Sequence, residues 1–416
     1  MRDIVIVGGG VIGLSTAYYA ARRGLRVTLL ERGPEDHDCC SLHNAGMIVP
    51  SHFVPLAAPG ALSLALRWMW NPASPLYIKP RLDADLIRWG WNFMRSANPG
   101  HVARSAPLLR DLTLASRGLF EELAALPGAD FGLVKKGLVM LCRTQHALDE
   151  EASTARHAVE LGIPAEVLDA RATAALDPGV TMSVAGSVYF PKDCHLAPAR
   201  FLGELRHRLL AAGGRIEWNT EVTGWDISRD RVRNVRTRNG DFAGDDFVLC
   251  GGSWSPEISR DLGLQLPLQA GKGYSLTVAH PRQLPQICAI FTEARVAITP
   301  IGSALRFGGT MEIAGLNLDI HPVRIRGIVN AVPKYYPEFR PEDFQGIGPW
   351  CGLRPVSPDG MPYLGRTHRH PNLVVATGHA MMGLSLAPIT GKLVSEILVG
   401  EPPSIPIDAL APERFG

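Results

Sequence analysis

The sequence predicts an α/β protein, α+β overall. A discontinuous Rossmann-like dinucleotide-binding domain receives an inserted domain of mostly antiparallel β-sheet and helices. Three observations predict this fold. The chain opens with an expected strand, a glycine-rich turn and a helix over residues 4–23, and it closes with the same pattern over residues 373–399. Another glycine-rich turn, residues 251–253, follows a short apolar strand in the second half of the chain. Residues 266–309 instead alternate in polarity and are rich in Pro and Gly, which is typical of antiparallel strands.

The first glycine pattern has a specific physical meaning. Gly8-x-Gly10-x-x-Gly13 stands between a short apolar strand and a helix. Gly8 permits the tight turn, Gly10 lets a pyrophosphate approach the helix N-terminus, and Gly13 lets helix and strand pack closely. A second apolar strand ends in Glu31, 18 residues past Gly13, where a carboxylate can accept hydrogen bonds from both ribose hydroxyls. Together these features predict dinucleotide binding.

The loop after Glu31 ends in small residues, Ser41 and Asn44-Ala45-Gly46. Small side chains allow the backbone to come close to a ligand, and this loop leaves the sheet beside the expected dinucleotide crevice. We therefore interpret residues 41–50 as a loop that contacts the ligand. A plain connecting loop is the alternative.

Length and composition limit the class of protein. The 416 residues suffice for two domains, and 46% apolar with 20% charged residues fits a well-packed enzyme. A net charge of +2 does not indicate a nucleic-acid partner. The seven cysteines are scattered without a CxxC pair, which argues against a zinc site or a disulfide framework and favours reduced thiols in the cytoplasm.

Residues 53–95 differ from the rest of the chain. Half of the eight tryptophans fall here, at Trp68, Trp70, Trp89 and Trp91. Amphipathic segments that carry Trp and Arg can lie in a membrane interface. The other interpretation is that the segment packs as a helical cap over the ligand site.

The repeated strand-glycine-helix patterns set the expected domain boundaries. We place the dinucleotide-binding domain at residues 1–60, 145–262 and 345–416. The inserted substrate domain takes residues 61–144 and 263–344, which hold the alternating strands and the Trp-rich segment.

Six motifs carry a resemblance to a known family. They are Gly8 to Gly13, Ser41 with Asn44-Ala45-Gly46, residues 248–255, Gly271-Lys272-Gly273-Tyr274, residues 352–360, and Thr377-Gly378-His379 with Gly383. Their order resembles that of the D-amino acid oxidase-like flavoenzymes, over nearly the whole chain. That family includes glycine oxidase, sarcosine oxidase and bacterial D-amino acid dehydrogenase, and the last of these is the branch that the sequence resembles most.

The resemblance implies FAD as the cofactor. Sarcosine oxidases attach FAD through a Cys, but that position falls on Gly352, next to Cys351, so we expect non-covalent FAD. The N-terminal glycines would hold the pyrophosphate, and Glu31 would hold the ribose. Val222 would flank the adenine, and the glycine turn near the C-terminus would contact the edge of the flavin. The implied cofactor-binding residues are Gly8, Gly10, Val11, Ile12, Gly13, Glu31, Arg32, Ser41, Asn44, Ala45, Gly46, Met47, Val222, Gly251, Trp254, Arg354, Gly378, His379, Met381, Met382, Gly383 and Leu384.

The resemblance also implies a reaction. A D-amino acid would give a hydride to flavin N5, and water would hydrolyse the imine to a 2-oxo acid and ammonia. The electrons would pass to a quinone or another carrier. An arginine fork can bind both oxygens of the substrate carboxylate. Arg306 and Arg354 match the family's carboxylate-binding positions, Tyr274 would add a hydrogen bond, and Met47 would lie beside the flavin.

Other functions stay open at this point. The same fold could act on D-proline, hydroxy-D-proline, glycine or sarcosine, as a dehydrogenase or as an oxidase that uses O2. The chain could also be a flavoprotein subunit that needs a partner, or an NAD enzyme with a convergent glycine motif. We expect a cytoplasmic protein with a small-molecule substrate, and peripheral contact with the inner membrane through residues 53–95 is one interpretation.

Overall fold

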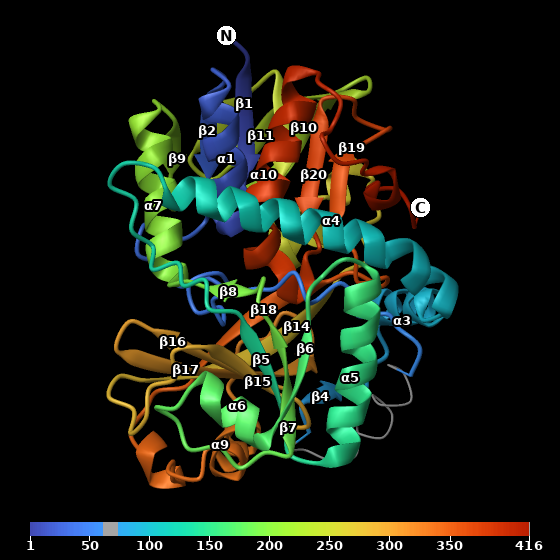
Figure 1. Cartoon of the computed structure of the whole chain (residues 1–416). Helices are drawn as coiled ribbons and strands as arrows, with labels where there is room; N and C mark the ends of the chain where they lie inside the picture. Colours follow the sequence, from blue (N-terminus) through green and yellow to red (C-terminus); the bar gives the residue numbers. More distant parts are fainter. Residues whose placement is uncertain (61–73, 416) are drawn as a thin grey trace.

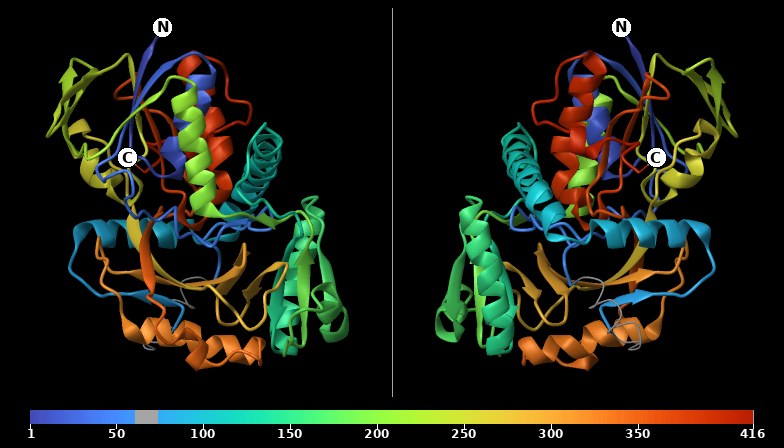
Figure 2. Two further views of the ribbon diagram at one scale, coloured as in Figure 1. Left: turned by 90° about the vertical axis from the view of Figure 1, so that its left-hand side faces the viewer. Right: turned by 90° about the vertical axis from the view of Figure 1, so that its right-hand side faces the viewer.

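Two large sheets organise the protein (Figure 1). The computed structural model describes residues 1–60 and 74–415. A six-stranded, mostly parallel sheet and a nine-stranded, mostly antiparallel sheet form the two halves of the molecule, and Figure 2 shows the same division from both sides. The predicted α/β class, with α+β character overall, is confirmed.

The six-stranded sheet collects strands from four separate stretches of the chain. Its order is β19-β20-β13-β1-β2-β9, and all neighbours are parallel except β19 and β20. The strands are β1 (Asp3–Val7), β2 (Arg26–Leu30), β9 (Arg215–Glu217), β13 (Asp246–Leu249), β19 (Tyr363–Arg366) and β20 (Leu373–Thr377). This is the discontinuous Rossmann-like sheet that the sequence predicts.

Helices cover one face of this sheet. α1 (Val11–Arg22) packs against α10 (Gly383–Val399), while α7 (Pro198–Ala211) contacts α1 and α4 (Pro99–Ala124) contacts α10. Their apolar faces form the largest core cluster. The stretch Ala380–Val399 is long and apolar enough to span a membrane, yet 78% of its most apolar window is buried inside the protein. It therefore packs here as a core helix.

A small sheet covers the opposite face. It consists of β10 (Val222–Ser228), β11 (Arg231–Thr237) and β12 (Gly240–Ala243), joined in antiparallel order. Trp225 and Val235 of this sheet pack into one apolar cluster with Phe247 of β13. The six-stranded sheet is thus buried on both faces, as parallel sheets require.

The nine-stranded sheet forms the other half. Its order is β18-β14-β17-β16-β15-β5-β7-β6, with β4 added beside β17. The strands are β4 (Leu76–Ile78), β5 (Leu138–Cys142), β6 (Glu166–Asp169), β7 (Gly186–Phe190), β14 (Gln269–Val278), β15 (Cys288–Phe291), β16 (Val296–Ile301), β17 (Ala304–Ile313) and β18 (Trp350–Val356). α9 (Pro322–Tyr335) packs on one face around the buried apolar residues Leu276 and Phe307, while α5 (Gln145–Glu160) and α6 (Ala170–Leu176) contact β7.

The domain ranges stay a prediction, and the strand pairing adds detail to them. β6 and β7 pair within the nine-stranded sheet, although we assigned residues 145–262 to the dinucleotide-binding domain. β18 also lies in that sheet, although it belongs to residues 345–416. Both differences arise because β7 pairs with β5 and β18 pairs with β14, and sequence periodicity does not reveal which strands pair.

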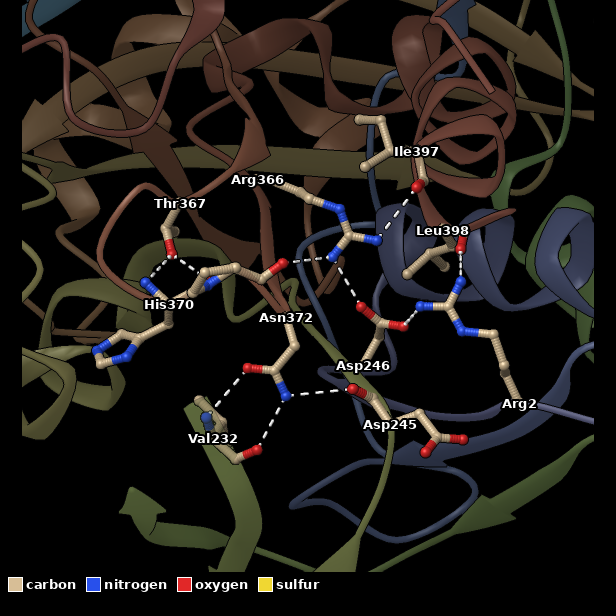
Figure 3. A network of polar contacts seen from close by, with 11 residues as sticks. Arg2, Val232, Asp245, Asp246, Arg366, Thr367, His370, Asn372, Ile397 and Leu398 are labelled. Carbon is tan, nitrogen blue, oxygen red and sulfur yellow. Dashed lines mark hydrogen bonds and ion pairs between the residues drawn. The ribbon is translucent and has the colours of Figure 1, made fainter. Parts of the chain in front are cut away.

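A buried carboxylate, Asp246, ties the start of the six-stranded sheet to the end of α10 (Figure 3). Arg2 and Arg366 both pair with it, the latter at 2.7 Å between Nη1 and Oδ1. The same two arginines donate to the carbonyl oxygens of Leu398 and Ile397 in the last turn of α10. Cations at a helix C-terminus also interact favourably with the helix dipole.

Candidate active site

A cavity of about 600 Å³ opens at the carboxyl ends of β1, β2, β13 and β20, beside β18 of the other sheet. Ligands of open α/β sheets bind at this edge. The predicted residues that line the cavity are Gly8, Gly10, Val11, Ile12, Glu31, Arg32, Ser41, Asn44, Val222, Gly251, Trp254, Arg354, His379, Gly383 and Leu384. Segments far apart in the sequence therefore meet around one space.

The glycine turn between β1 and α1 has the geometry that its sequence predicts. Gly8 has φ +108°, and a Cβ there would overlap the carbonyl of Cys250. A Cβ at Gly13 would overlap the carbonyl of Gly8, so helix and strand could not pack as they do. A Cβ at Gly10 would come no nearer than 3.6 Å to Ser41 Oγ, and Gly10, the N-cap residue, has no side chain that could occupy this helix end. The α1 N-terminus thus leaves room for a phosphate group.

Glu31 lies at the end of β2, against the glycine turn. Its Oε2 accepts a hydrogen bond from Gly9 N at 2.7 Å, and its Oε1 accepts one from Gly33 N at 2.9 Å. A carboxylate has four acceptor positions, so two more hydrogen bonds can be accepted. This fits the predicted contact with ribose hydroxyls.

The loop after β2 is fixed to the same helix end. Ser41 Oγ accepts a hydrogen bond from Val11 N at 3.1 Å, and Asn44 Oδ1 accepts one from Gly46 N at 2.8 Å. Beyond the loop, Arg32 stacks on the ring of Trp254, 3.7 Å from its centroid. The ligand-contacting interpretation of the loop fits the positions of Ser41 and Asn44, which both line the cavity.

His379 follows β20 and lines the cavity. It is buried, and its Nε2 lies 3.0 Å from Thr390 Oγ1. Its Nδ1 is buried without a hydrogen-bond partner in the described part of the chain. Burial lowers the pKa of His379 to about 3, so the ring is neutral at physiological pH. A neutral ring with a free nitrogen fits a contact to a polar ligand and does not fit a cationic role.

Arg354 projects from β18 toward the cavity. Its guanidinium lies flat over the backbone of β14, where a Cβ at Gly273 would overlap it. Nη1 donates to the carbonyl of Thr310 at 2.8 Å, and no carboxylate in residues 1–60 or 74–415 pairs with the group. Burial lowers the pKa of Arg354. An arginine fork on the cavity wall without a carboxylate partner can bind an anionic ligand.

Arg306 lies on the same sheet face but has other partners. Nη1 donates to the carbonyls of Asn44 at 2.7 Å and Leu42 at 3.4 Å, and Nε donates to Thr277 Oγ1 at 3.1 Å. Burial lowers its pKa to about 10. Arg306 does not line the cavity; the structure places it behind the cofactor loop, which its hydrogen bonds hold.

Tyr274 is not brought to the cavity. It shares a core cluster with Leu276 and Tyr335 on the α9 face of the sheet, opposite the two arginines. Its hydroxyl donates to Glu312 Oε2 at 2.6 Å, and burial, followed by Glu312, raises its pKa. A third hydrogen bond from Tyr274 to the substrate therefore does not fit this geometry. The period-2 alternation of β14 could have placed Tyr274 and Thr277 on opposite faces.

Met47 is buried outside the cavity lining, in β3 (Met47–Ile48), which pairs with β8 (Cys194–His195). Its carbonyl accepts a hydrogen bond from Ser385 Oγ at 3.0 Å. Beside this strand pair, the buried Asp193 accepts hydrogen bonds from Ser51 N and Ser51 Oγ. Burial raises the pKa of Asp193 to about 7.

The remaining predicted residues do not line the cavity. These are Gly13, Ala45, Gly46, Gly378, Met381 and Met382. Conversely, sequence reasoning missed several lining residues: Asp38, Cys39, Cys40, Thr220, Leu318 and Trp350. The pattern Cys39-Cys40-Ser41 adjoins a predicted loop and could have been included. Leu318 and Trp350 carry no local signal. The β14–β18 pairing places Trp350 here, and Leu318 lies in the loop after β17, where its carbonyl accepts a hydrogen bond from Cys351 Sγ at 3.0 Å.

Comparison with known proteins now assigns the family. A profile of the family described as FAD dependent oxidoreductase matches residues 3–397. The chain belongs to this family. The D-amino acid dehydrogenase of Cereibacter sphaeroides is 33% identical over 417 residues, which cover 99% of this chain and 95% of that protein. D-amino acid dehydrogenase 1 of Mesorhizobium japonicum is 32% identical and covers 99% of each chain.

Solved structures give the same fold for this FAD dependent oxidoreductase. Glycine oxidase from Geobacillus kaustophilus superimposes with a TM-score of 0.79 at 24% identity, covering 100% of this chain and 99% of that chain. L-proline dehydrogenase from P. horikoshii superimposes with a TM-score of 0.74 at 18% identity, covering 100% and 97%. The expected resemblance to D-amino acid oxidase-like flavoenzymes is confirmed.

The cofactor of the family, FAD, fits the cavity. The side-chain-free surface at Gly10 and the acceptor positions of Glu31 lie on one continuous space, and His379, whose buried Nδ1 has no hydrogen-bond partner among the described residues, adjoins it. They match a ligand with a pyrophosphate, a ribose and a polar ring. The predicted use of FAD instead of NAD is thus confirmed by the family.

Proposed function

We propose that the protein oxidises a D-amino acid to the 2-oxo acid and ammonia and passes the electrons to a quinone or carrier. The observation that carries this proposal is Arg354, a guanidinium group on the wall of the cofactor cavity without a carboxylate partner among the described residues. A substrate with one carboxylate would complete its charge pairing. The D-amino acid dehydrogenases at 33% and 32% identity support the choice of substrate class.

In this proposal, each side chain of the site has a separate role. Arg354 binds both carboxylate oxygens and so fixes the substrate α-carbon against the cofactor. His379, neutral and buried, presents Nδ1 as a hydrogen-bonding atom without adding a charge. Bound FAD supplies the two-electron acceptor. The substrate loses a hydride from its α-carbon and a proton from its amine, and water then hydrolyses the imine.

We further propose that electron transfer takes place at the inner membrane, on which an otherwise cytoplasmic protein would lie. α3 (Ala84–Ser96) exposes Ile87, Trp91 and Met94 on one helix face, with Arg88 and Arg95 also exposed. Apolar and cationic residues on one helix suit an anionic lipid surface. Trp89 instead is buried, with Nε1 bonded to the carbonyl of Val356, as the cap interpretation expects. Trp68 and Trp70 lie outside the described residues.

Anaerobic flavin bleaching tests the substrate proposal. Holoenzyme is mixed in turn with D-amino acids, D-proline, hydroxy-D-proline, their L forms, glycine and sarcosine, and the absorbance of oxidised flavin is followed. Rapid bleaching by a D-amino acid supports the proposal. Bleaching only by a cyclic or secondary amine moves the function to that class. Bleaching by none, although flavin is present, overturns the proposal and favours a subunit that needs a partner chain.

The acceptor and the membrane contact have separate tests. Readmitting air distinguishes a dehydrogenase, which stays bleached, from an oxidase, which regains its colour. For the membrane, the holoenzyme is floated with vesicles of phosphatidylglycerol and phosphatidylethanolamine. Trp91→Ser should reduce the bound fraction, whereas Leu210→Ser, at an exposed apolar residue on α7, should not. Equal binding of both variants would contradict a contact through α3.

A further inference from the structure

The carbonyl that orients Arg354 belongs to a strained residue. Thr310 has φ +69°, a left-handed conformation that is rare for a β-branched residue. Its carbonyl accepts the 2.8 Å hydrogen bond from Arg354 Nη1. The direction of the arginine fork therefore depends on a backbone conformation that Thr does not prefer.

A β-bulge produces this conformation. In the pairing of β14 with β17, Tyr274 of β14 lies opposite Gly309, and Lys272 of β14 lies opposite Glu312. Between these pairs, Gly273 on β14 faces both Thr310 and Met311 on β17. In bulges of this kind the left-handed position is normally occupied by glycine. Since Thr310 occupies it here, other contacts must hold the bulge.

A buried acid joins the two strands on either side of the bulge. Glu312, 2% exposed, accepts a hydrogen bond from the Tyr274 hydroxyl at 2.6 Å, and its Oε1 lies 3.7 Å from Lys272 Nζ. His321 Nε2 lies 3.4 Å from the same Oε1. Lys272 is also fully buried and donates to Asn317 Oδ1 and to the carbonyl of Asp319. Buried ion pairs add little net stability, and fixing a register is their best-attested use.

We propose that Tyr274 and Glu312 are positioning residues for the substrate carboxylate. They act through the sheet: their hydrogen bond holds the bulge, the bulge sets the Thr310 carbonyl, and the carbonyl aims Arg354. They need no contact with substrate, because they lie on the α9 face and Arg354 lies on the opposite face. This inference rests on the proposed carboxylate-binding role of Arg354.

The test measures carboxylate binding apart from turnover. Propionate, which carries a carboxylate but no amine, is titrated into holoenzyme, and its Kd is read from the flavin spectrum. Tyr274→Phe should raise this Kd about tenfold, because a small misplacement of a binding group has large effects. Tyr335→Phe is the matched control, since it removes a hydroxyl bonded to the carboxylate of Glu293 in the same core cluster. It should change the Kd by less than about twofold.

A rescue experiment separates positioning from general damage. Glycine adopts positive φ without a side-chain penalty. In a Thr310→Gly background the bulge no longer depends on Glu312, so adding Tyr274→Phe should change the propionate Kd by less than about twofold. A tenfold change in both backgrounds, or an equal change in Tyr335→Phe, would overturn the positioning role while leaving the proposed function intact.

Arg354→Lys tests whether Arg354 binds the substrate carboxylate. Lysine keeps the charge but loses the planar fork, so the propionate Kd should rise at least about tenfold. An unchanged Kd in Arg354→Lys would remove the basis of both the proposed function and the positioning role. A raised Kd in Arg354→Lys with no effect of Tyr274→Phe would overturn the positioning role alone.

Discussion

Arg306 donates a hydrogen bond from Nη1 to the carbonyl oxygen of Asn44 at 2.7 Å, and so joins the nine-stranded sheet to the loop after β2. Asn44 lines the cofactor cavity, whereas Arg306 does not. The contact therefore connects the substrate-side sheet with the position of a cofactor-binding loop.

Arg306→Ala should weaken FAD binding more than substrate binding. The variant removes a buried donor and leaves the carbonyl of Asn44 unpaired, at a cost of about 1–3 kcal/mol. We expect the Kd of FAD, measured by flavin fluorescence on reconstitution, to rise about tenfold or more. Arg171→Ala, at an exposed position of α6, is the control. A raised KM with unchanged FAD affinity would instead assign Arg306 to the substrate.

Glu31→Gln should weaken the binding of FAD and the binding of ADP to the same extent. Glu31 accepts from Gly9 N and Gly33 N, and hydrogen bonds to a charged group are worth about 1.5–3 kcal/mol. ADP shares the ribose and pyrophosphate with FAD, so its Kd in calorimetric titration of the apoprotein should rise about tenfold. Glu35→Gln, at an exposed carboxylate nearby, should leave both Kd values unchanged. Weaker FAD binding with normal ADP binding would place Glu31 elsewhere on the cofactor.

Asp193 should make the protein less stable as pH rises toward neutrality. Burial raises its folded pKa to about 7 from 3.8, so the folded state binds the proton more tightly than the unfolded state. The contribution of protonated Asp193 to the free energy of unfolding is complete below pH 3.8. It declines by up to about 1.4 kcal/mol per pH unit as pH approaches 7. Relative to Asp193→Asn, the wild type should lose unfolding temperature between pH 5 and pH 8. A relative gain over this interval would contradict the assigned protonation.

Asp246→Asn should destabilise the fold without changing the active site. Asp246 is buried, whereas the side chains of its partners Arg2 and Arg366 are 46% and 31% exposed, so we expect the loss of its charge-assisted hydrogen bonds to cost about 1.5–3 kcal/mol. Asp3→Asn breaks an exposed pair with Arg26 and should cost less than about 1 kcal/mol. Urea unfolding of the holoenzyme measures both. A raised substrate KM in Asp246→Asn would show that the two ends of the sheet are coupled.

The nucleotide half of the site was predictable because its signals are local. Gly8, Gly10, Gly13 and Glu31 lie within one strand-helix-strand unit, and the structure gives each the geometry that its residue type suggests. The strand-glycine-helix pattern at the C-terminus likewise placed His379 at the cavity.

The substrate half depends on contacts between distant strands. Motif position alone grouped Tyr274 with Arg306 and Arg354, but the alternation of β14 places Tyr274 on the other face. The predicted domain ranges assign some strands differently from the sheets for the same reason. β7 joins the nine-stranded sheet by pairing with β5, and β18 joins it by pairing with β14, and no local pattern identifies those partners.

The assembly of the six-stranded sheet has a consequence for biosynthesis. In the order of translation, β1 precedes its neighbour β13 by more than 200 residues and precedes β20 and α10 by more than 350 residues. The helix that packs on α1 is thus translated long after α1 itself. Until then, the nascent chain leaves uncovered the edge of β1 that pairs with β13 and the side of α1 that packs on α10, which is the situation in which chaperones act. Chains that end before β20 therefore lack one wall of the cofactor cavity.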